Sequence, residues 1–401
     1  MNQPPGPDLR TPVSLLTGFL GSGKTTLLNA WLRDPALADA AVIVNEFGEI
    51  GIDHALIASS NDNTIELSTG CLCCTVRGDL VETLRDLRAK RSAGEVPNFS
   101  RVLIETTGLA DPVPVIQALI TFPVARAFRL GRVITVVDSV NGAATLEAHD
   151  EAVRQVVVAD ELIVSKTDLP EADTAALVER LQQLNPGAGI TRSADGAHPP
   201  ASLLDGVDIY DPAARPDAVK EWLKADRYEG AVREGQHTHH GGDHHAPDQH
   251  AHDHPSYRDG DGHADHAHEH AEADGHGGHD SRHAHRHDVN RHSADIGSFC
   301  LSFDEPLQWE HVSAWLDALV MAHGEQLLRV KGILDIAGRS RPIVLQAVQR
   351  LFHPPTELAD WPDGDRRSRI VFITRGLSRE FVLEVLDTLR ARAPVHAGEH
   401  A

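Results

Sequence analysis

The chain has 401 residues, and 59 acidic against 37 basic side chains give it a formal net charge of −22. A chain this negative repels the phosphate backbone of DNA and RNA and attracts cations, so we expect no nucleic acid among its partners. No apolar run approaches the roughly 20 residues of a membrane span, and the N-terminal residues lack the layout of a signal peptide. We therefore expect a cytoplasmic protein without a membrane partner.

The first motif is G-F-L-G-S-G-K-T-T at 18–26, between an apolar run at 13–16 and a helical pattern at 27–32. Strand, G-x-x-x-x-G-K-T and helix in this order are the context of a phosphate-binding P-loop. Its glycines let backbone N–H groups turn toward phosphate oxygens at a helix N-terminus. The residues expected to bind nucleotide here are Gly18, Gly21, Ser22, Gly23, Lys24, Thr25 and Thr26.

Two P-loop side chains are expected to take part in the chemistry. Lys24 is expected to reach the β- and γ-phosphates and to act in catalysis. The Thr25 hydroxyl is expected to bind Mg²⁺, which makes Thr25 a metal ligand as well as a nucleotide contact. The motif therefore predicts a protein that binds a nucleoside triphosphate.

Up to about residue 224, short β-branched runs alternate with helical patterns. Further strands are predicted at 41–45, 101–105, 133–137 and 161–164. Further helices are predicted at 79–90, 114–121 and 171–184. This alternation predicts an α/β fold, the doubly wound and mostly parallel sheet of P-loop NTPases, whose functional loops leave the carboxyl ends of the strands.

The segment 45–53, N-E-F-G-E-I-G-I-D, follows the second strand, where GTPases keep a loop that reorders on hydrolysis. Glu46 and Glu49 are placed to face the γ-phosphate or to complete a metal site, and we take Glu46 as a metal ligand. Asp53 is expected to orient the attacking water, as a catalytic residue. The alternative is a solvated acidic loop without a specific role.

Three cysteines, Cys71, Cys73 and Cys74, lie within four residues after Gly70. A tight turn brings such thiols together, and three thiolates suit Zn²⁺, Cu(I) by softness, or Co²⁺ as a substitute. A three-ligand site leaves the fourth position open, which metal transfer requires. The alternative is a set of small buried apolar side chains, and that is what we expect of Cys300, which stands alone in an apolar run.

Two later motifs follow predicted strands. Glu105, at the end of the strand 101–105, is expected to hold Mg²⁺ through a water and to act in catalysis, and the Gly108 N–H is expected to sense the γ-phosphate. In the run 165–168, S-K-T-D, Lys166 is expected to lie along a guanine base whose two N–H donors bond to Asp168. The alternative for this second run is an ordinary turn at the start of a helix.

Between 236 and 292 the composition changes, because eighteen of the 26 histidines lie there among Asp, Gly and Ala. We expect this segment to be disordered and to gather metal ions weakly, or else to be an inert linker. Beyond it, strands are predicted at 296–303, 327–336, 343–351 and 369–374, and helices at 307–323 and 378–392. They form a small α+β domain.

These observations divide the chain into five parts. They are a flexible tail at 1–10, a P-loop GTPase domain at 11–228, a disordered histidine-rich linker at 229–294, a C-terminal α+β domain at 295–395 and a tail at 396–401.

Four motifs together resemble the CobW family of GTP-dependent metal chaperones. They are T-G-F-L-G-S-G-K-T-T at 17–26, N-E-F-G-E at 45–49, G-C-L-C-C at 70–74 and E-T-T-G-L-A-D-P at 105–112. The resemblance implies a C-terminal domain of the CobW type and a metal-handling GTPase whose Cys-x-Cys-Cys thiols bind zinc or, in some members, cobalt. One departure is Ser165, where many members have Asn.

From these features we expect a GTP-hydrolysing metallochaperone that uses Mg²⁺, binds zinc and delivers it to a client protein. The alternatives are a cobalt chaperone for cobalamin synthesis or nitrile hydratase activation, a histidine-rich metal buffer, and a P-loop ATPase or kinase. Client choice depends on surface complementarity, so the sequence names no client and no oligomeric state.

Overall fold

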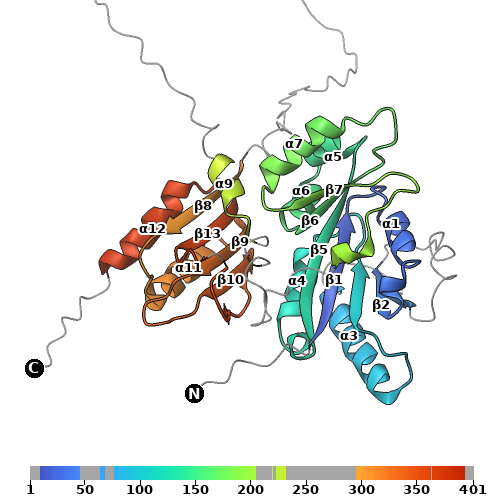
Figure 1. Ribbon diagram of the computed structural model, residues 1–401, viewed down its shortest axis with the longest axis horizontal. Helices are drawn as coiled ribbons and strands as arrows, with labels where there is room; N and C mark the ends of the chain where they lie inside the picture. The colour runs from blue at the N-terminus through green and yellow to red at the C-terminus, as the bar shows by residue number, and fades with distance from the viewer. Residues whose placement is uncertain are drawn as a thin grey trace, which may run out of the picture. The chain divides into compact units, whose positions relative to one another are not determined.

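The computed structural model describes residues 10–45, 64–67, 76–204, 219, 223–231, 295–362 and 364–392. The contacts divide the chain into two compact units, one formed by 1–235 with 289–401 and the other by 236–288. All described residues lie in the first unit, which contains two sheets (Figure 1).

The N-terminal sheet has seven strands in the order β3-β2-β4-β1-β5-β6-β7, and every neighbouring pair is parallel. The strands are β1 (Thr11–Gly18), β2 (Ala40–Asn45), β3 (Thr64–Leu67), β4 (Arg101–Glu105), β5 (Phe128–Asp138), β6 (Glu161–Ser165) and β7 (Gly189–Arg192). The chain begins in the middle of this sheet at β1 and builds outward on both sides, as expected of a doubly wound fold.

Helices cover both faces of this sheet. They are α1 (Lys24–Trp31), α3 (Val76–Ala93), α4 (Val113–Ile120), α5 (Gly142–Ala148), α6 (Asp150–Val157) and α7 (Thr174–Leu184). The short helix α9 (Asp226–Ala231) lies instead beside β8 (Ile296–Phe303) of the second sheet. Short 3-10 turns are η1 (Pro35–Leu37), η2 (Val124–Arg126) and η3 (Ala201–Leu204).

Continuous apolar runs form the central strands because successive side chains of a strand point to opposite faces, and both faces are covered here. In β4, Ile104 packs with Leu84 of α3 and Leu119 of α4, whereas Leu103 packs with Leu28 and Trp31 of α1 on the other face. The predicted fold class is confirmed for this sheet.

Sequence reasoning missed β3, β7, α5, α6 and α9 in this part of the chain, and it placed the start of β5 too late. β3 and β7 are four residues long, too short for a clear period of two. β5 begins five residues before the predicted start, because Arg129, Gly131 and Arg132 interrupt the apolar pattern. The helices α5 and α6, of seven and eight residues, share a stretch for which no helix was predicted.

The C-terminal sheet is antiparallel, with strand order β11-β10-β9-β13-β8 and β12 beside β10. Its elements are β8 (Ile296–Phe303), α11 (Trp309–His323), β9 (Leu327–Leu334), β10 (Ile343–Val348), β11 (Leu351–Phe352), β12 (Thr356–Glu357), β13 (Ser368–Arg375) and α12 (Arg379–Arg392). They confirm the predicted α+β domain, and β11 and β12 are additions to it.

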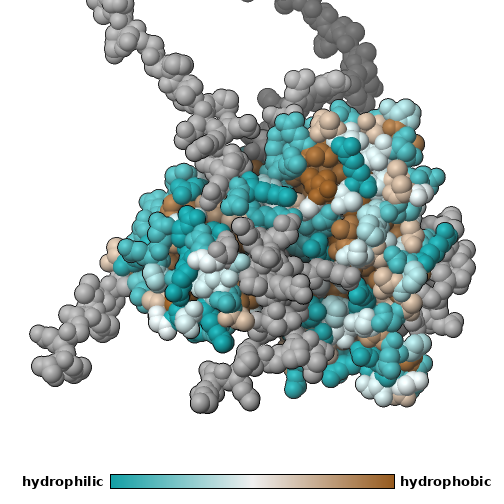
Figure 2. Space-filling model, in the orientation of Figure 1, coloured by the Kyte–Doolittle hydropathy of each residue, from teal (hydrophilic) through white to brown (hydrophobic). Residues whose placement is uncertain are grey.

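Both helices pack on one face of this sheet, where Trp315 of α11 and Leu386 of α12 meet Phe372 of β13. Cys300 is buried in β8, as predicted, and belongs to a cluster that also contains Val156 of α6 and Leu181 of α7. Figure 2 shows hydrophilic side chains over much of the coloured surface, with apolar groups gathered in a few places.

A buried charge cluster also links the two sheets. Arg329 of β9 donates to the carbonyl oxygens of Val158 and Ala159 and pairs with Asp160, and the Lys331 Nζ lies 3.3 Å from an Asp160 carboxylate oxygen. Burial raises the pKa of Asp160, but Arg329 and Lys331 outweigh that effect and hold it well below its usual range. Burial and Arg329 lower the pKa of Lys331 to about 7.

Replacing Asp160 tests this cluster. Asp160→Asn leaves two buried cations without their carboxylate, so we expect the free energy of unfolding in urea to fall by about 3–5 kcal/mol at neutral pH. Because the folded-state pKa of Asp160 lies below its unfolded value, the stabilisation is full above about pH 4 and is lost as the pH falls further. The difference in the free energy of unfolding between the parent protein and Asp160→Asn should therefore become smaller in acid.

The control is Asp150→Asn, because Asp150 pairs with Arg375 at 3.4 Å in a partly exposed position. We expect this change to cost less than about 1 kcal/mol. If both variants lost the same free energy of unfolding, the stabilising role of the Asp160 charge beside Arg329 and Lys331 would be contradicted.

Candidate functional site

The P-loop connects the end of β1 to the first turn of α1, at the carboxyl edge of the parallel sheet. Gly18, Gly21 and Gly23 have φ angles of 143°, 70° and 94°, which side-chain-bearing residues rarely adopt. A Cβ at Gly18 would also lie 2.3 Å from the Val136 carbonyl oxygen. Glycine is thus required at the point where the loop passes β5.

Lys24 lies across this loop. Its Nζ donates to the Phe19 carbonyl oxygen at 3.0 Å, and its side chain is buried. Burial lowers the pKa of Lys24, and the nearby Glu105 carboxylate partly opposes that effect. The cation is held where the backbone of the loop turns, which is the position predicted for a phosphate contact.

The two residues predicted to hold Mg²⁺ are brought together. The Thr25 Oγ1 donates to the Glu105 Oε1 at 2.7 Å, although 80 residues separate them. The contact arises because β1 and β4 are neighbours with Leu16 paired to Glu105, so the end of β4 reaches the start of α1. A hydroxyl and a carboxylate oxygen are ligands that Mg²⁺ accepts beside water and phosphate oxygens, so the donor set fits this ion.

Gly108 lies against the P-loop. A Cβ there would lie 2.6 Å from the Leu20 backbone nitrogen, so only glycine fits without a shift of backbone. The loop that carries it starts at Thr106, whose Oγ1 donates to the Thr17 Oγ1 at 2.8 Å. The predicted γ-phosphate sensor is thus in direct contact with the phosphate-binding loop.

A residue that sequence reasoning missed holds the loop that carries Gly108. The Gln155 Nε2 donates to the carbonyl oxygens of Gly108 and Ala110 at 3.1 and 3.0 Å, and the neighbouring Arg154 pairs with Asp111 at 3.1 Å. Gln155 is 1% exposed, among the apolar residues of α6. The signal in the sequence was a polar side chain among the apolar residues of a helix, but it could not be recognised because α6 itself was not predicted.

The S-K-T-D run lies at the end of β6, beside the P-loop. The Ser165 Oγ donates to the Ser22 carbonyl oxygen at 2.6 Å. The Lys166 Nζ lies 2.6 Å from the Asp138 Oδ2, and Asp168 is exposed, its Oδ1 accepting from the Asp195 N–H at 3.4 Å.

Asp138, at the end of β5, was given no role by the sequence. It also accepts hydrogen bonds from the Val140 N–H at 2.8 Å and the Asn141 Nδ2 at 3.1 Å. Burial raises its pKa, but the bonds from Lys166, Val140 and Asn141 outweigh burial and lower it. Asp138 stays ionised and fixes the direction of the Lys166 side chain.

These elements enclose a cavity of about 230 Å³ that is lined by P-loop residues from Phe19 to Ser22 and, among others, by Asp138, Gln155 and Lys166. Strand ends from β1, β5 and β6 therefore meet around one space, as parallel strands in a doubly wound sheet do.

Other predicted residues lie outside the described residues: Glu46, Glu49, Asp53, Cys71, Cys73 and Cys74, and so does the histidine tract. Within the part of the chain that the structure describes, no group of three or more His, Cys, Asp or Glu side chains is placed to hold a metal ion. Among the same residues no helix is long and apolar enough to cross a membrane.

Two family models match the chain. The nucleotide-binding domain of CobW/HypB/UreG matches residues 12–192, and the C-terminal domain of the cobalamin synthesis protein cobW matches residues 296–390. Together they span well over half of the chain. The chain belongs to the CobW family.

Named relatives agree with this assignment. The CobW-family chain is 29% identical over 383 residues to the zinc chaperone YjiA of Escherichia coli, which covers 94% of this chain and 98% of YjiA. It is 42% identical over 156 residues to the zinc chaperone CobW of Pseudomonas aeruginosa, covering 36% of this chain and 40% of that protein. The Zn(II)-bound YjiA GTPase from E. coli shares the fold, with a TM-score of 0.60 at 24% identity over 95% of this chain and 99% of that chain.

Lys24→Ala removes the cation that lies across the P-loop. We expect nucleotide binding to be lost in a titration with a fluorescent GTP analogue, because the phosphates lose their charged partner. Circular dichroism should show an unchanged fold. Binding at full strength would contradict the assignment of this loop.

Gln155→Ala leaves the Gly108 and Ala110 carbonyl oxygens without these two donors. We expect GTP hydrolysis to fall about tenfold and the preference for GTP over GDP to shrink, because the substitution releases the loop that is predicted to sense the γ-phosphate. Gln182→Ala, an exposed position on α7, is the matched control. A loss of stability with an unchanged GTP-to-GDP affinity ratio would show a structural role alone.

Proposed function

We propose that this CobW-family GTPase is a metallochaperone that hydrolyses GTP to control how tightly it holds zinc. The contact between Thr25 and Glu105 beside Lys24 is the observation on which the GTPase half of this proposal depends. The names of its relatives, zinc chaperone and zinc-regulated GTPase metalloprotein activator, support zinc as the cargo.

In this proposal each described residue has a defined task. The P-loop N–H groups and Lys24 bind the phosphates, and Thr25 and Glu105 hold Mg²⁺, which supplies charge neutralisation to the β- and γ-phosphates when bound. The Gly108 N–H donates to the γ-phosphate, and Asp53 orients the attacking water.

Guanine selection is assigned to the S-K-T-D run. Lys166 lies along the base and Asp168, which is exposed at this edge, accepts from the two guanine N–H donors. Ser165 takes the position of the family's Asn, and its hydrogen bond to the Ser22 carbonyl oxygen supports a role in joining the base-binding turn to the P-loop.

The zinc site is assigned to Cys71, Cys73 and Cys74, with Glu46 as a further ligand. Its support comes from the strands on either side. β2 ends at Asn45 and β3 ends at Leu67, and these two residues are paired in the parallel sheet. The strands that precede Glu46 and the cysteines in the sequence therefore end at the same edge of the sheet as β1 does.

Coupling follows from that shared edge. GTP orders the loops after β2 and β4 and brings the thiolates and Glu46 into one site, and loss of the γ-phosphate releases them, so the ion passes to a client metalloprotein. Linkage requires that zinc tighten GTP binding by the same factor by which GTP tightens zinc binding.

Zinc affinity in each nucleotide state tests this coupling. In competition with a chelator, we expect zinc to bind at least about tenfold more tightly with a non-hydrolysable GTP analogue than with GDP. Cys73→Ala should weaken zinc by about a hundredfold or more and leave GTP binding intact. Cys300→Ala, in the core of β8, is the matched control. Equal zinc affinity in all states would contradict the proposal.

A second candidate, a metal buffer that works through its histidine tract, is favoured only by the eighteen histidines between 236 and 292. Deleting that tract separates the two functions. A chaperone keeps one tight site, whereas a buffer loses nearly all of its capacity.

A further inference from the structure

A second pocket lies at the opposite edge of the parallel sheet. It has a volume of about 480 Å³ and is lined by Arg10, Thr11, Arg88, Arg91, Ser92, Asn98, Phe99, Arg126, Ala127 and Phe128. Thr11 and Phe128 are the first residues of β1 and β5, whereas the P-loop follows the last residue of β1. Eight residues of strand separate the two sites by about 23 Å.

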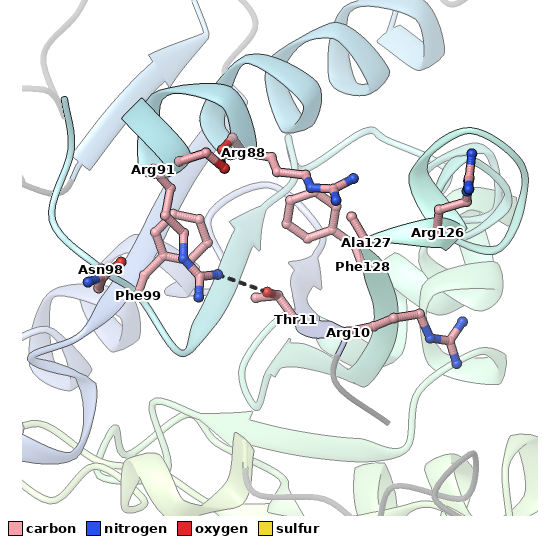
Figure 3. A pocket seen from close by; sticks show the side chains of 10 residues that line it. Arg10, Thr11, Arg88, Arg91, Asn98, Phe99, Arg126, Ala127 and Phe128 are labelled. Carbon is pink, nitrogen blue, oxygen red and sulfur yellow. Dashed lines mark hydrogen bonds between the residues drawn. The ribbon is translucent and has the colours of Figure 1, made fainter. Parts of the chain in front are cut away.

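Four arginines line this pocket, and none of its lining residues is acidic. Figure 3 shows Arg88 and Arg91 reaching from α3 toward Thr11 and Phe128, with Arg10 and Arg126 on the side of β1 and η2. Among the described residues, Arg88 and Arg126 have no ion pair and no side-chain hydrogen bond. Positive charge is thus concentrated here in a chain whose net charge is −22.

An arginine cluster differs from a lysine or histidine cluster, because a guanidinium does not lose its proton at any physiological pH. Their charge is therefore available to an anion at every physiological pH, and the concave shape partly shields a bound anion from water.

One arginine is already held in place. The Arg91 NH1 donates to the Thr11 Oγ1 at 3.2 Å, and its guanidinium lies 4.7 Å from the centre of the Phe99 ring. The Thr11 hydroxyl accepts this bond and keeps its own proton for a ligand, and the Asn98 amide adds further donors. Such pre-organisation lowers the entropic cost of binding.

We infer that this pocket binds a small molecule with two or more phosphate groups. Planar guanidinium forks match phosphate oxygens in bidentate pairs, and the volume lies within the range of small-molecule sites rather than of flat protein interfaces. The site is separate from the P-loop and does not depend on the function proposed above.

Calorimetric titration with inorganic pyrophosphate tests the inference. The protein is first saturated with GDP and Mg²⁺, so that the P-loop is filled. We expect one molecule to bind per chain, and to bind more weakly as ionic strength rises. Replacing Arg88 and Arg91 together by Ala should weaken binding by about ten- to a hundredfold and leave GDP affinity unchanged, which shows that the variant is folded.

Two controls locate the site. Arg85→Ala, on an exposed position of α3 outside the pocket, should keep full pyrophosphate affinity. Lys24→Ala should also bind pyrophosphate, because the P-loop is not involved.

The inference is wrong if GDP-saturated protein binds no pyrophosphate or if the double variant binds it as well as the parent. It is also wrong if a polyglutamate peptide binds through Arg88 and Arg91 and pyrophosphate does not, because the pocket is then a docking surface for acidic protein segments.

Discussion

The pairing of β1 with β4 and β5 is the constraint on which the nucleotide site depends. Because Leu16 lies opposite Glu105 in one neighbour, the Glu105 carboxylate reaches the Thr25 hydroxyl, and because Gly18 passes over Val136 in the other, the P-loop backbone is fixed in its glycine-only shape. Gly108 then lies against Leu20 with no room for a side chain. The P-loop and the loop that carries Gly108 are therefore in close contact.

One helix connects this site to the rest of the unit. The Gln155 amide of α6 holds the loop from Gly108 to Ala110, and the carbonyl oxygens of Val158 and Ala159, just after the same helix, accept bonds from Arg329 of the C-terminal sheet. The negative charge of the adjacent Asp160 offsets the energetic cost of burying the positive charges of Arg329 and Lys331. The loop from Gly108 to Ala110 and the second sheet therefore share α6 as a common support.

Charge is distributed unevenly within the N-terminal sheet. At the carboxyl edge, the cations Lys24 and Lys166 each lie beside a carboxylate, Glu105 and Asp138 respectively. At the amino edge, the four arginines of the second pocket share a cavity without an acidic lining residue. Charges paired within the protein are neutralised there, whereas Arg88 and Arg126, which have no side-chain partner among the described residues, leave a field that acts on solutes.

The sequence alone determined the P-loop, the α/β and α+β parts and the core position of Cys300, because these depend on local periodicity and on motifs a few residues long; the Mg²⁺ role of Thr25 and Glu105 stays a prediction. Only the tertiary structure decided that Gln155 holds Gly108, that Asp138 orients Lys166, and that arginines from η2, α3 and the start of β1 share one pocket. Such contacts join residues that strand order brings together across tens of positions, and no local pattern encodes that order. The roles of Asp53 and the three clustered cysteines remain predictions, since they lie outside the described residues.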